Sequence, residues 1–203
     1  MIGLNRRRTM GNALPYDAEI EYLESDGYCV VSTNTVLTGY DNTIYAKFLI
    51  RGYTSEAKYY GNVWGCYGGE VYNTYRVIRG GGNDKSILIY NGRRASDGYT
   101  RNSYALNTVC NLTLNPNNYI INGTTKNYTN NNNRGTENTV VFKPFFNWSK
   151  LLVYYFKVLK GDSVILDLIP VRVGQVGYMY DKVSGQLFGN SGTGNFILGN
   201  DVN

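Results

Sequence analysis

The stretch LDLIPVRVGQVGYMYDKVSGQLFGNSGTGNF, residues 166–196, decides the fold class. Alternating apolar residues predict a strand into Pro170, a second strand at residues 176–180 and a third at 186–188. The turn between the second and third strands combines a side-chain acceptor, a hydroxyl and a residue that tolerates positive φ: Asp181, Ser184 and Gly185. The stretch therefore predicts antiparallel strands joined by tight turns. It contains no residue pattern typical of an active site.

The composition points the same way. The chain has 203 residues, enough for one sizeable domain with a buried core. It contains 20 Tyr and 24 Gly against only 17% charged residues, and Asn is also frequent. Tyr suits strands and half-exposed faces, whereas Asn and Gly suit turns, so we expect an all-β protein with much surface loop. The net charge of +5 favours an anionic partner, although solubility alone would also account for it.

The absence of histidine and the spacing of the cysteines exclude several kinds of site. With no His in the chain, Ser-His-Asp and Cys-His nucleophiles and His-based zinc sites are ruled out. The cysteines Cys29, Cys66 and Cys110 are widely spaced and odd in number. We therefore expect buried thiols in a reducing cytosol rather than a metal site or a disulfide framework.

No apolar run approaches the length of a membrane span. The opening MIGLNRRRTMGNALPYD has basic residues but no apolar segment after them, unlike a secretion signal. These features predict synthesis in the cytosol without a membrane segment.

Short alternating runs fill most of the chain between turn residues. In one of them, residues 43–50, four apolar side chains point one way: Ile44, Ala46, Phe48 and Ile50. Further strands are expected at residues 20–23, 28–32, 59–66, 72–78, 86–90, 108–114, 119–121, 140–146, 150–159, 164–173 and 195–198. About a dozen short strands without a helical period are the signature of a β-sandwich or jelly roll. We expect hairpins that join 108–114 to 119–121 and 150–159 to 164–173.

Two segments look different from the rest. Residues 1–14 are polar, basic and aperiodic, and we expect an extended arm ahead of a domain at 15–203. Residues 127–137, NYTNNNNRGTE, cannot bury apolar surface and are expected to form an exposed loop.

Catalysis would have to rest on carboxylates. A glycosidase needs two of them about 5–10 Å apart across a cleft, and the candidates are Glu19, Glu21, Glu24, Asp162 and Asp167. Acidic residues on a short edge strand usually face solvent and prevent the strand from pairing with other chains. We therefore do not expect an enzyme. The glycine-rich stretches 80–82 and 189–194 lack the Lys-Ser/Thr of a phosphate-binding loop and are interpreted as plain loops.

Residues expected in loops are the candidates for metal and sugar binding. Asp41, Asp84, Asn91 and Asp97 form no calcium-loop ladder, so no metal and no cofactor are expected. Aromatic loop residues could stack on sugar rings, and the candidate glycan-binding residues are Tyr53, Tyr67, Tyr99 and Tyr104. The same residues would also suit a protein–protein contact. Trp64 and Trp148 are expected to lie in the core.

The basic arm is the other candidate site. It combines basic charge with apolar side chains in Ile2, Leu4, Arg6, Arg7, Arg8 and Met10. One interpretation is a disordered start. The other is a segment that becomes ordered on an acidic groove of a neighbouring subunit, through bidentate Arg–carboxylate contacts.

Three stretches of the sequence carry a family resemblance: LPYDAEIEYLESDG at residues 14–27, DLIPVR at 167–172 and GYMYDKVSGQLFGNSGTGNF at 177–196. They closely resemble a family of concanavalin A-like (laminin G-like) jelly-roll proteins encoded by phages and prophages of gut Bacteroides, including crAss-like phages. MIGLNRRR-type openings precede the domain in that family. The resemblance covers residues 1–27 and 150–202 well and the middle of the chain poorly.

The resemblance implies a non-enzymatic virion structural protein. It would be an all-β jelly-roll domain at 15–203 that attaches to the particle through a docking arm at 1–14. We expect an auxiliary capsid (decoration) or head-fibre protein whose partners are other virion proteins, oligomeric in the assembled particle. The alternative is a lectin-like receptor-binding or adhesin module that recognises host surface glycan. Neither hypothesis involves nucleic acid or a membrane.

Overall fold

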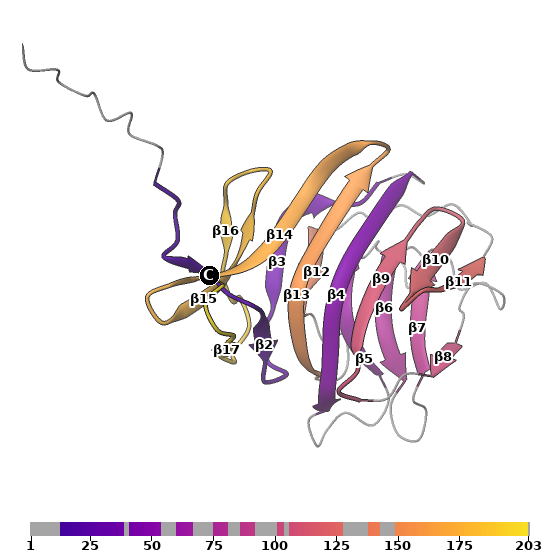
Figure 1. Ribbon diagram of the computed structural model, residues 1–203, viewed down its shortest axis with the longest axis horizontal. Coiled ribbons are helices and arrows are strands. Elements are labelled where there is room, and N and C mark those ends of the chain that lie inside the picture. Colours follow the sequence, from indigo (N-terminus) through magenta and orange to yellow (C-terminus); the bar gives the residue numbers. More distant parts are fainter. Residues whose placement is uncertain are drawn as a thin grey trace, which may run out of the picture.

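The computed structural model describes residues 13–38, 41–53, 60–66, 75–80, 86–91, 101–103, 106–127, 138–142 and 149–202. Within these ranges the chain forms β-strands, turns and loops, with no helix. Every strand pair between them is antiparallel, in two separate sheets (Figure 1). The prediction of an all-β protein is therefore confirmed.

The larger sheet has eleven strands and contains both ends of the described chain. Its main path runs in the order β11-β10-β9-β4-β13-β14-β15-β16, and β1, β2 and β17 join at one end. The strands are β1 (Ala18–Glu19), β2 (Leu23–Ser25), β4 (Asn42–Tyr53), β9 (Val109–Leu114), β10 (Asn118–Ile121), β11 (Thr124–Asn127), β13 (Ser149–Lys160), β14 (Ser163–Val173), β15 (Val176–Asp181), β16 (Leu187–Phe188) and β17 (Phe196–Leu198).

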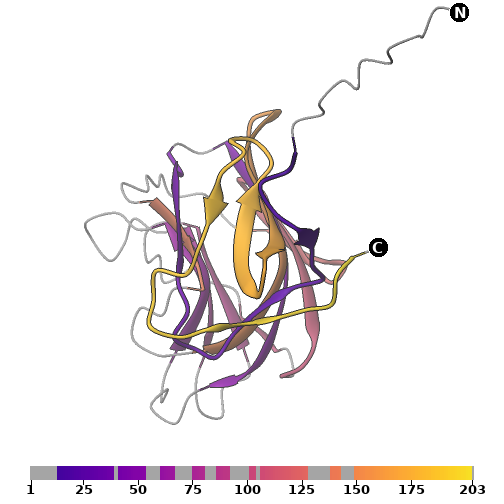
Figure 2. The same ribbon diagram turned by 90° about the vertical axis from the view of Figure 1, so that its left-hand side faces the viewer.

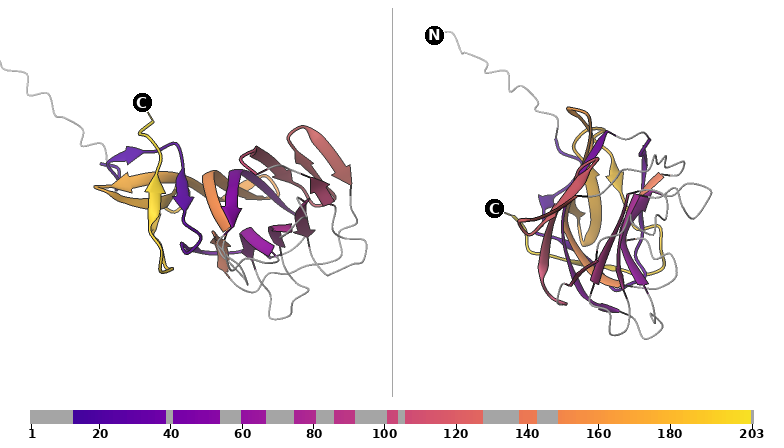
Figure 3. Two further views of the ribbon diagram at one scale, coloured as in Figure 1. Left: turned by 90° about the horizontal axis from the view of Figure 1, so that it is seen from below. Right: turned by 90° about the vertical axis from the view of Figure 1, so that its right-hand side faces the viewer.

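The smaller sheet has six strands in the order β3-β12-β5-β6-β7-β8. They are β3 (Val31–Val36), β5 (Tyr60–Cys66), β6 (Tyr75–Gly80), β7 (Ser86–Asn91), β8 (Arg101–Ser103) and β12 (Asn138–Val141). Viewed from the side, the two sheets lie as facing layers (Figure 3, right). This arrangement is consistent with a β-sandwich.

The core lies between the two layers. Along β4, Ile44, Ala46 and Phe48 are buried, as the alternation predicted, and the residues between them face outward. Phe156 of β13 meets Trp64 of β5 across the layers, with ring centroids 5.2 Å apart. Because the two residues belong to different sheets, this contact holds the layers together. Trp64 is fully buried, which confirms its expected place in the core.

On the edge of β13 opposite β4, two different strands pair with it one after the other. The first part of β13 pairs with β2 through Leu151–Ser25 and the two following pairs, and its second part pairs with β14 from Phe156 onward. β17 adds to the other side of β2, and the yellow C-terminal segment closes this end of the molecule (Figure 2). A Cβ atom on Gly177 of β15 would overlap the ends of Leu23 and Leu198, so glycine permits this close approach.

The turn between β15 and β16 is built as its residues predicted. Asp181 is buried, and its carboxylate accepts hydrogen bonds from the backbone N–H groups of Val183 and Ser184 (both 3.1 Å) and from the Ser184 hydroxyl (2.7 Å). It also accepts the N–H of Asp167 on β14 at 2.8 Å. Gly185 has φ of 73°, the left-handed conformation that the turn requires.

The boundaries of the long strands agree with prediction and those of several short strands do not. The hairpins β9–β10 and β13–β14 form as expected. Of the strand expected at residues 20–23, only Leu23 lies in a strand, because the chain leaves β14 after β1 and reaches β13 only where β2 begins. The strand expected at 28–32 begins later, at Val31, and β8 and β11 were not predicted. Residues 128–137, most of the predicted Asn-rich loop, lie outside the described residues.

Candidate functional site

Most of the predicted site residues lie outside the described part of the chain. This holds for Ile2, Leu4, Arg6, Arg7, Arg8 and Met10 and for Tyr67, Tyr99 and Tyr104, and Trp148, which was expected in the core, also lies outside the described residues. Tyr53 is placed by its backbone at the end of β4, where it pairs with Ser149. The residues that follow the expected arm, from residue 13 onward, are described.

Residues 17–20 are hydrogen-bonded along the edge of β14. The N–H of Asp17 donates to the carbonyl of Arg172 at 2.9 Å, and the N–H of Ile20 donates to the carbonyl of Pro170 at 3.0 Å. Between them Ala18 pairs with Arg172 in β1. The Tyr16 ring packs edge-on against the Tyr180 ring at 4.9 Å. Residues 16–20 are therefore held by both backbone and side chains.

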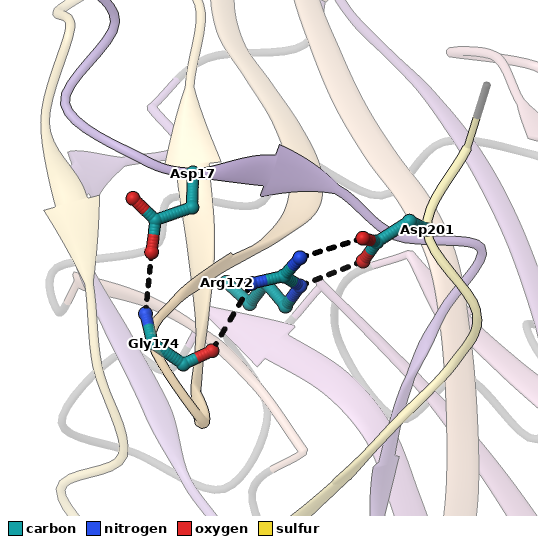
Figure 4. Close-up of polar contacts among 4 residues, drawn as sticks. All are labelled: Asp17, Arg172, Gly174 and Asp201. Atoms are coloured by element: carbon teal, nitrogen blue, oxygen red, sulfur yellow. Dashed lines mark hydrogen bonds and ion pairs between the residues drawn. The ribbon is translucent and has the colours of Figure 1, made fainter.

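A second layer of contacts joins the two ends of the domain (Figure 4). The Arg172 guanidinium donates from Nε and Nη2 to the two carboxylate oxygens of Asp201, at 2.7 and 2.6 Å. Its Nη1 donates to the carbonyl of Gly174 at 3.3 Å. The N–H of Gly174 in turn donates to the Asp17 carboxylate at 2.6 Å. We call Asp17, Arg172, Gly174 and Asp201 the terminal clamp.

The C-terminal segment runs along the other side of residues 17–21. The N–H of Val202 donates to the carbonyl of Glu19 at 2.8 Å, and the N–H of Glu21 donates to the carbonyl of Asn200 at 2.9 Å. Ile20 and Asp201 form an isolated antiparallel bridge. Residues 17–21 thus lie between β14 and the C-terminal segment and are hydrogen-bonded to both.

Apolar side chains are exposed next to the terminal clamp. Leu14 is 59% exposed, Val176 55% and Val202 54%, and each lies within three residues of a clamp residue along the chain.

The charges in the terminal clamp stabilise each other. Hydrogen bonding to Arg172 lowers the pKa of the Asp201 carboxyl, and the same contact raises the pKa of the guanidinium. Burial, together with the hydrogen bond that the Tyr16 hydroxyl donates to Glu19, raises the pKa of Tyr16 to about 12. The Arg172–Asp201 pair therefore stays charged throughout the neutral range.

The stability that the Arg172–Asp201 pair gives to the folded state is expected to disappear in acid. Because the folded pKa of Asp201 lies below its ordinary value of 3.8, the stabilisation is complete above that value and is lost as the pH falls through the folded pKa. We expect Asp201→Asn to be less stable than wild type at neutral pH and equal to it in strong acid, as measured by urea unfolding across the pH range. Salt of about 1 M should narrow the neutral-pH gap because the pair is exposed. A gap that is the same at every pH would contradict this prediction.

The other candidate groups have mainly structural partners. Glu24 pairs with Arg51 at 3.0 Å and Asp167 with Lys157 at 3.2 Å, while Asp162 lies exposed in the β13–β14 turn. Among the residues described, no group of three or more acidic or cysteine side chains could hold a metal ion. Asp41 is exposed, and Asp84 and Asp97 lie outside the described residues.

The described cysteines behave as core residues. Cys29 and Cys110 are both buried, as predicted, and burial raises the pKa of the Cys29 thiol to about 11. A thiol with so high a pKa is protonated at neutral pH and is a poor nucleophile. No helix in the described chain is long and apolar enough to cross a membrane.

One group of side chains was not recognised from the sequence. Tyr45 and Lys47 of β4 and Tyr155 and Lys157 of β13 share the outer face of the larger sheet, away from the core. The available signal was the repeated pattern Tyr-x-Lys, at residues 45–47 and 155–157. The two patterns form one surface group only because β4 and β13 are neighbours, and the sequence alone does not show that pairing.

Comparisons with family models, with curated proteins and with solved structures find no match to this chain.

Proposed function

We propose that the protein is a phage virion structural protein, an auxiliary capsid (decoration) or head-fibre protein, that attaches to the particle through residues 1–14. The observation that carries the proposal is the terminal clamp, which fastens residues 16–21 to β14 and to the C-terminal segment. A docking segment is useful only if the domain that it carries is firmly joined to it. The two-residue strand β1 alone would be a weak joint, and the clamp reinforces it.

The finer fold assignment is part of the same proposal. Two facing antiparallel sheets, with the first and last strands in one of them, agree with a concanavalin A-like jelly roll. The stretches that resemble the phage family, residues 14–27, 167–172 and 177–196, contain β1, β2, β16 and most of β14 and β15. Asp17 and Arg172 of the terminal clamp lie within these stretches, so the family resemblance and the proposed joint concern the same part of the domain.

The arm would supply the contacts to the particle. Arg6, Arg7 and Arg8 offer planar guanidinium groups that bind carboxylates in a bidentate manner, and Ile2 and Leu4 offer apolar side chains for a groove. The exposed Leu14 and Val176 beside the clamp would extend this contact onto the domain surface. The partner would be an acidic groove on a neighbouring capsid or fibre subunit.

The test is incorporation into particles. We expect deletion of residues 1–10 to reduce the copies per particle at least about tenfold, corresponding to roughly 1.4 kcal/mol or more of binding free energy. The purified variant should melt at the wild-type temperature, because the deletion leaves the terminal clamp intact. Copies per particle are measured by quantitative mass spectrometry of purified virions.

A charge-matched pair of variants separates docking from net charge. Replacing Arg6, Arg7 and Arg8 with Gln should reduce incorporation, whereas replacing the exposed Lys126, Lys150 and Lys182 with Gln should not. Both triple variants remove three positive charges. Stoichiometric incorporation of the deletion variant, or equal losses in the two triple variants, would reject the docking arm.

A further inference from the structure

The two Tyr-x-Lys patterns meet on neighbouring strands. In the antiparallel register Tyr45 lies opposite Lys157, and Lys47 lies opposite Tyr155. The four side chains therefore form a checkerboard, with tyrosines on one diagonal and lysines on the other. Beside it, the register shift between Val153 and Tyr155 places Tyr154 on the same outer face. We call Tyr45, Lys47, Tyr155 and Lys157 the tyrosine–lysine patch.

A shallow depression of about 430 Å³ opens on this face. It is lined by Tyr45, Tyr155, Lys157, Leu159 and Val164. Its volume falls within the range of small-molecule sites, about 300–1,000 Å³. The lining is largely aromatic and aliphatic.

The patch has an excess of positive charge. Lys157 is paired with Asp167 at 3.2 Å, so that this lysine is neutralised. Lys47 has a different neighbour: its Nζ lies 4.8 Å from the centre of the Tyr154 ring. Among the described residues, Lys47 forms no salt bridge. A cation held over an aromatic ring keeps its charge available for an anion.

The position of the patch within the sheet restricts what can bind. β4 is hydrogen-bonded to β9 on one side and β13 on the other, and β13 lies between β4 and β14. Their backbone groups are thus already paired, and a peptide cannot add to them as a new strand. Only side chains are presented: two aromatic rings, an ammonium group and a Lys–Asp pair.

We propose that the tyrosine–lysine patch binds an acidic glycan, through a sugar residue that bears a carboxylate. The C–H-rich face of the sugar ring packs on Tyr45 and Tyr155, which supply rigid apolar area. The carboxylate pairs with Lys47, and the sugar hydroxyls find donors and an acceptor in the Lys157–Asp167 pair. This ligand uses every feature of the patch without needing free backbone groups. The inference is independent of how the protein attaches to a particle.

The test is a titration of the full-length protein with defined oligosaccharides. Trigalacturonate and sialyllactose serve as acidic probes, and galactotriose and lactose are their neutral counterparts, with chemical shifts as the readout. We expect the acidic probes to bind at least about tenfold more tightly than the neutral ones. Lys47→Met should weaken acidic binding about tenfold, whereas Lys126→Met on β11, which removes the same charge elsewhere, should not.

The aromatic contribution is tested at Tyr155. Tyr155→Leu should weaken binding of the acidic probes more than Tyr155→Phe, because only the latter keeps an aromatic ring. Thermal melting of each variant tests whether the fold is retained.

Three results would overturn the proposal. The first is acidic binding that is unaffected by Lys47→Met and Tyr155→Leu. The second is no shift with any oligosaccharide at about 10 mM, a concentration that reveals even weak sites. The third is a short poly-glutamate peptide that binds with the same dependence on the variants while the sugars do not, which would identify an acidic protein segment as the ligand.

Discussion

Replacing Asp181 with alanine is expected to lower the free energy of unfolding by about 3–5 kcal/mol. The side chain is only 3% exposed, and its two oxygens accept four hydrogen bonds. Hydrogen bonds to a charged acceptor contribute about 1.5–3 kcal/mol each, although they are not additive within one group. The variant would leave the N–H groups of Asp167, Val183 and Ser184 without this acceptor. For a chain of this size the loss corresponds to a melting temperature roughly 10 °C lower.

Two comparison variants make the Asp181 prediction specific. Asp181→Asn can keep the bonds to one oxygen, so we expect it to lose about half as much stability. Asp162→Ala removes a carboxylate from an exposed turn and should change stability by less than about 0.5 kcal/mol. Urea denaturation followed by circular dichroism measures all three. If Asp181→Ala stays within about 1 kcal/mol of wild type, the carboxylate does not hold the turn in the manner described.

Replacing Phe156 with alanine should cost about 3–5 kcal/mol, the usual loss for a buried aromatic residue. Phe156 is 1% exposed and packs on Trp64, which is fully buried in the opposite sheet. The alanine variant would remove the contact between the layers and leave a cavity at the centre of the core. The same denaturation experiment measures the loss.

The Phe156 prediction also has matched controls. Phe156→Leu keeps most of the apolar volume and should cost less than half as much. Tyr155→Ala alters the next residue, which faces away from the core, and should cost less than Phe156→Ala. Equal losses at positions 155 and 156 would mean that the two sides of β13 are not distinguished as core and surface.

The strands that could be predicted are those whose side chains alternate. The run 43–50 shows one buried and one exposed face, and the structure extends it to β4. The β13–β14 hairpin was also recognised, since two long apolar runs enclose an evident turn at Gly161. The Asp181 turn follows from local chemistry, because its acceptors and donors lie within a few residues of each other.

What could not be predicted depends on contacts between distant segments. The division of β13 between β2 and β14 leaves no local signal, and β1 and β2 are too short for alternation to be visible. The pairing of Arg172 on β14 with Asp201 in the C-terminal segment joins residues 29 positions apart, and either side chain alone looks like an ordinary surface charge. The tyrosine–lysine patch likewise required the register of β4 against β13.

The position of the first strands has a consequence for how the chain acquires its structure. β1 pairs with β14, and β2 pairs with β13 and β17, so residues 18–25 have their strand partners only beyond residue 149. During synthesis these first strands must remain unpaired until their partners in residues 151–198 have been made. Such long-range pairing is slow, because a large loop must close before any contact forms. Residues 18–25 are therefore expected to be among the last to acquire their structure, after their partner strands have left the ribosome.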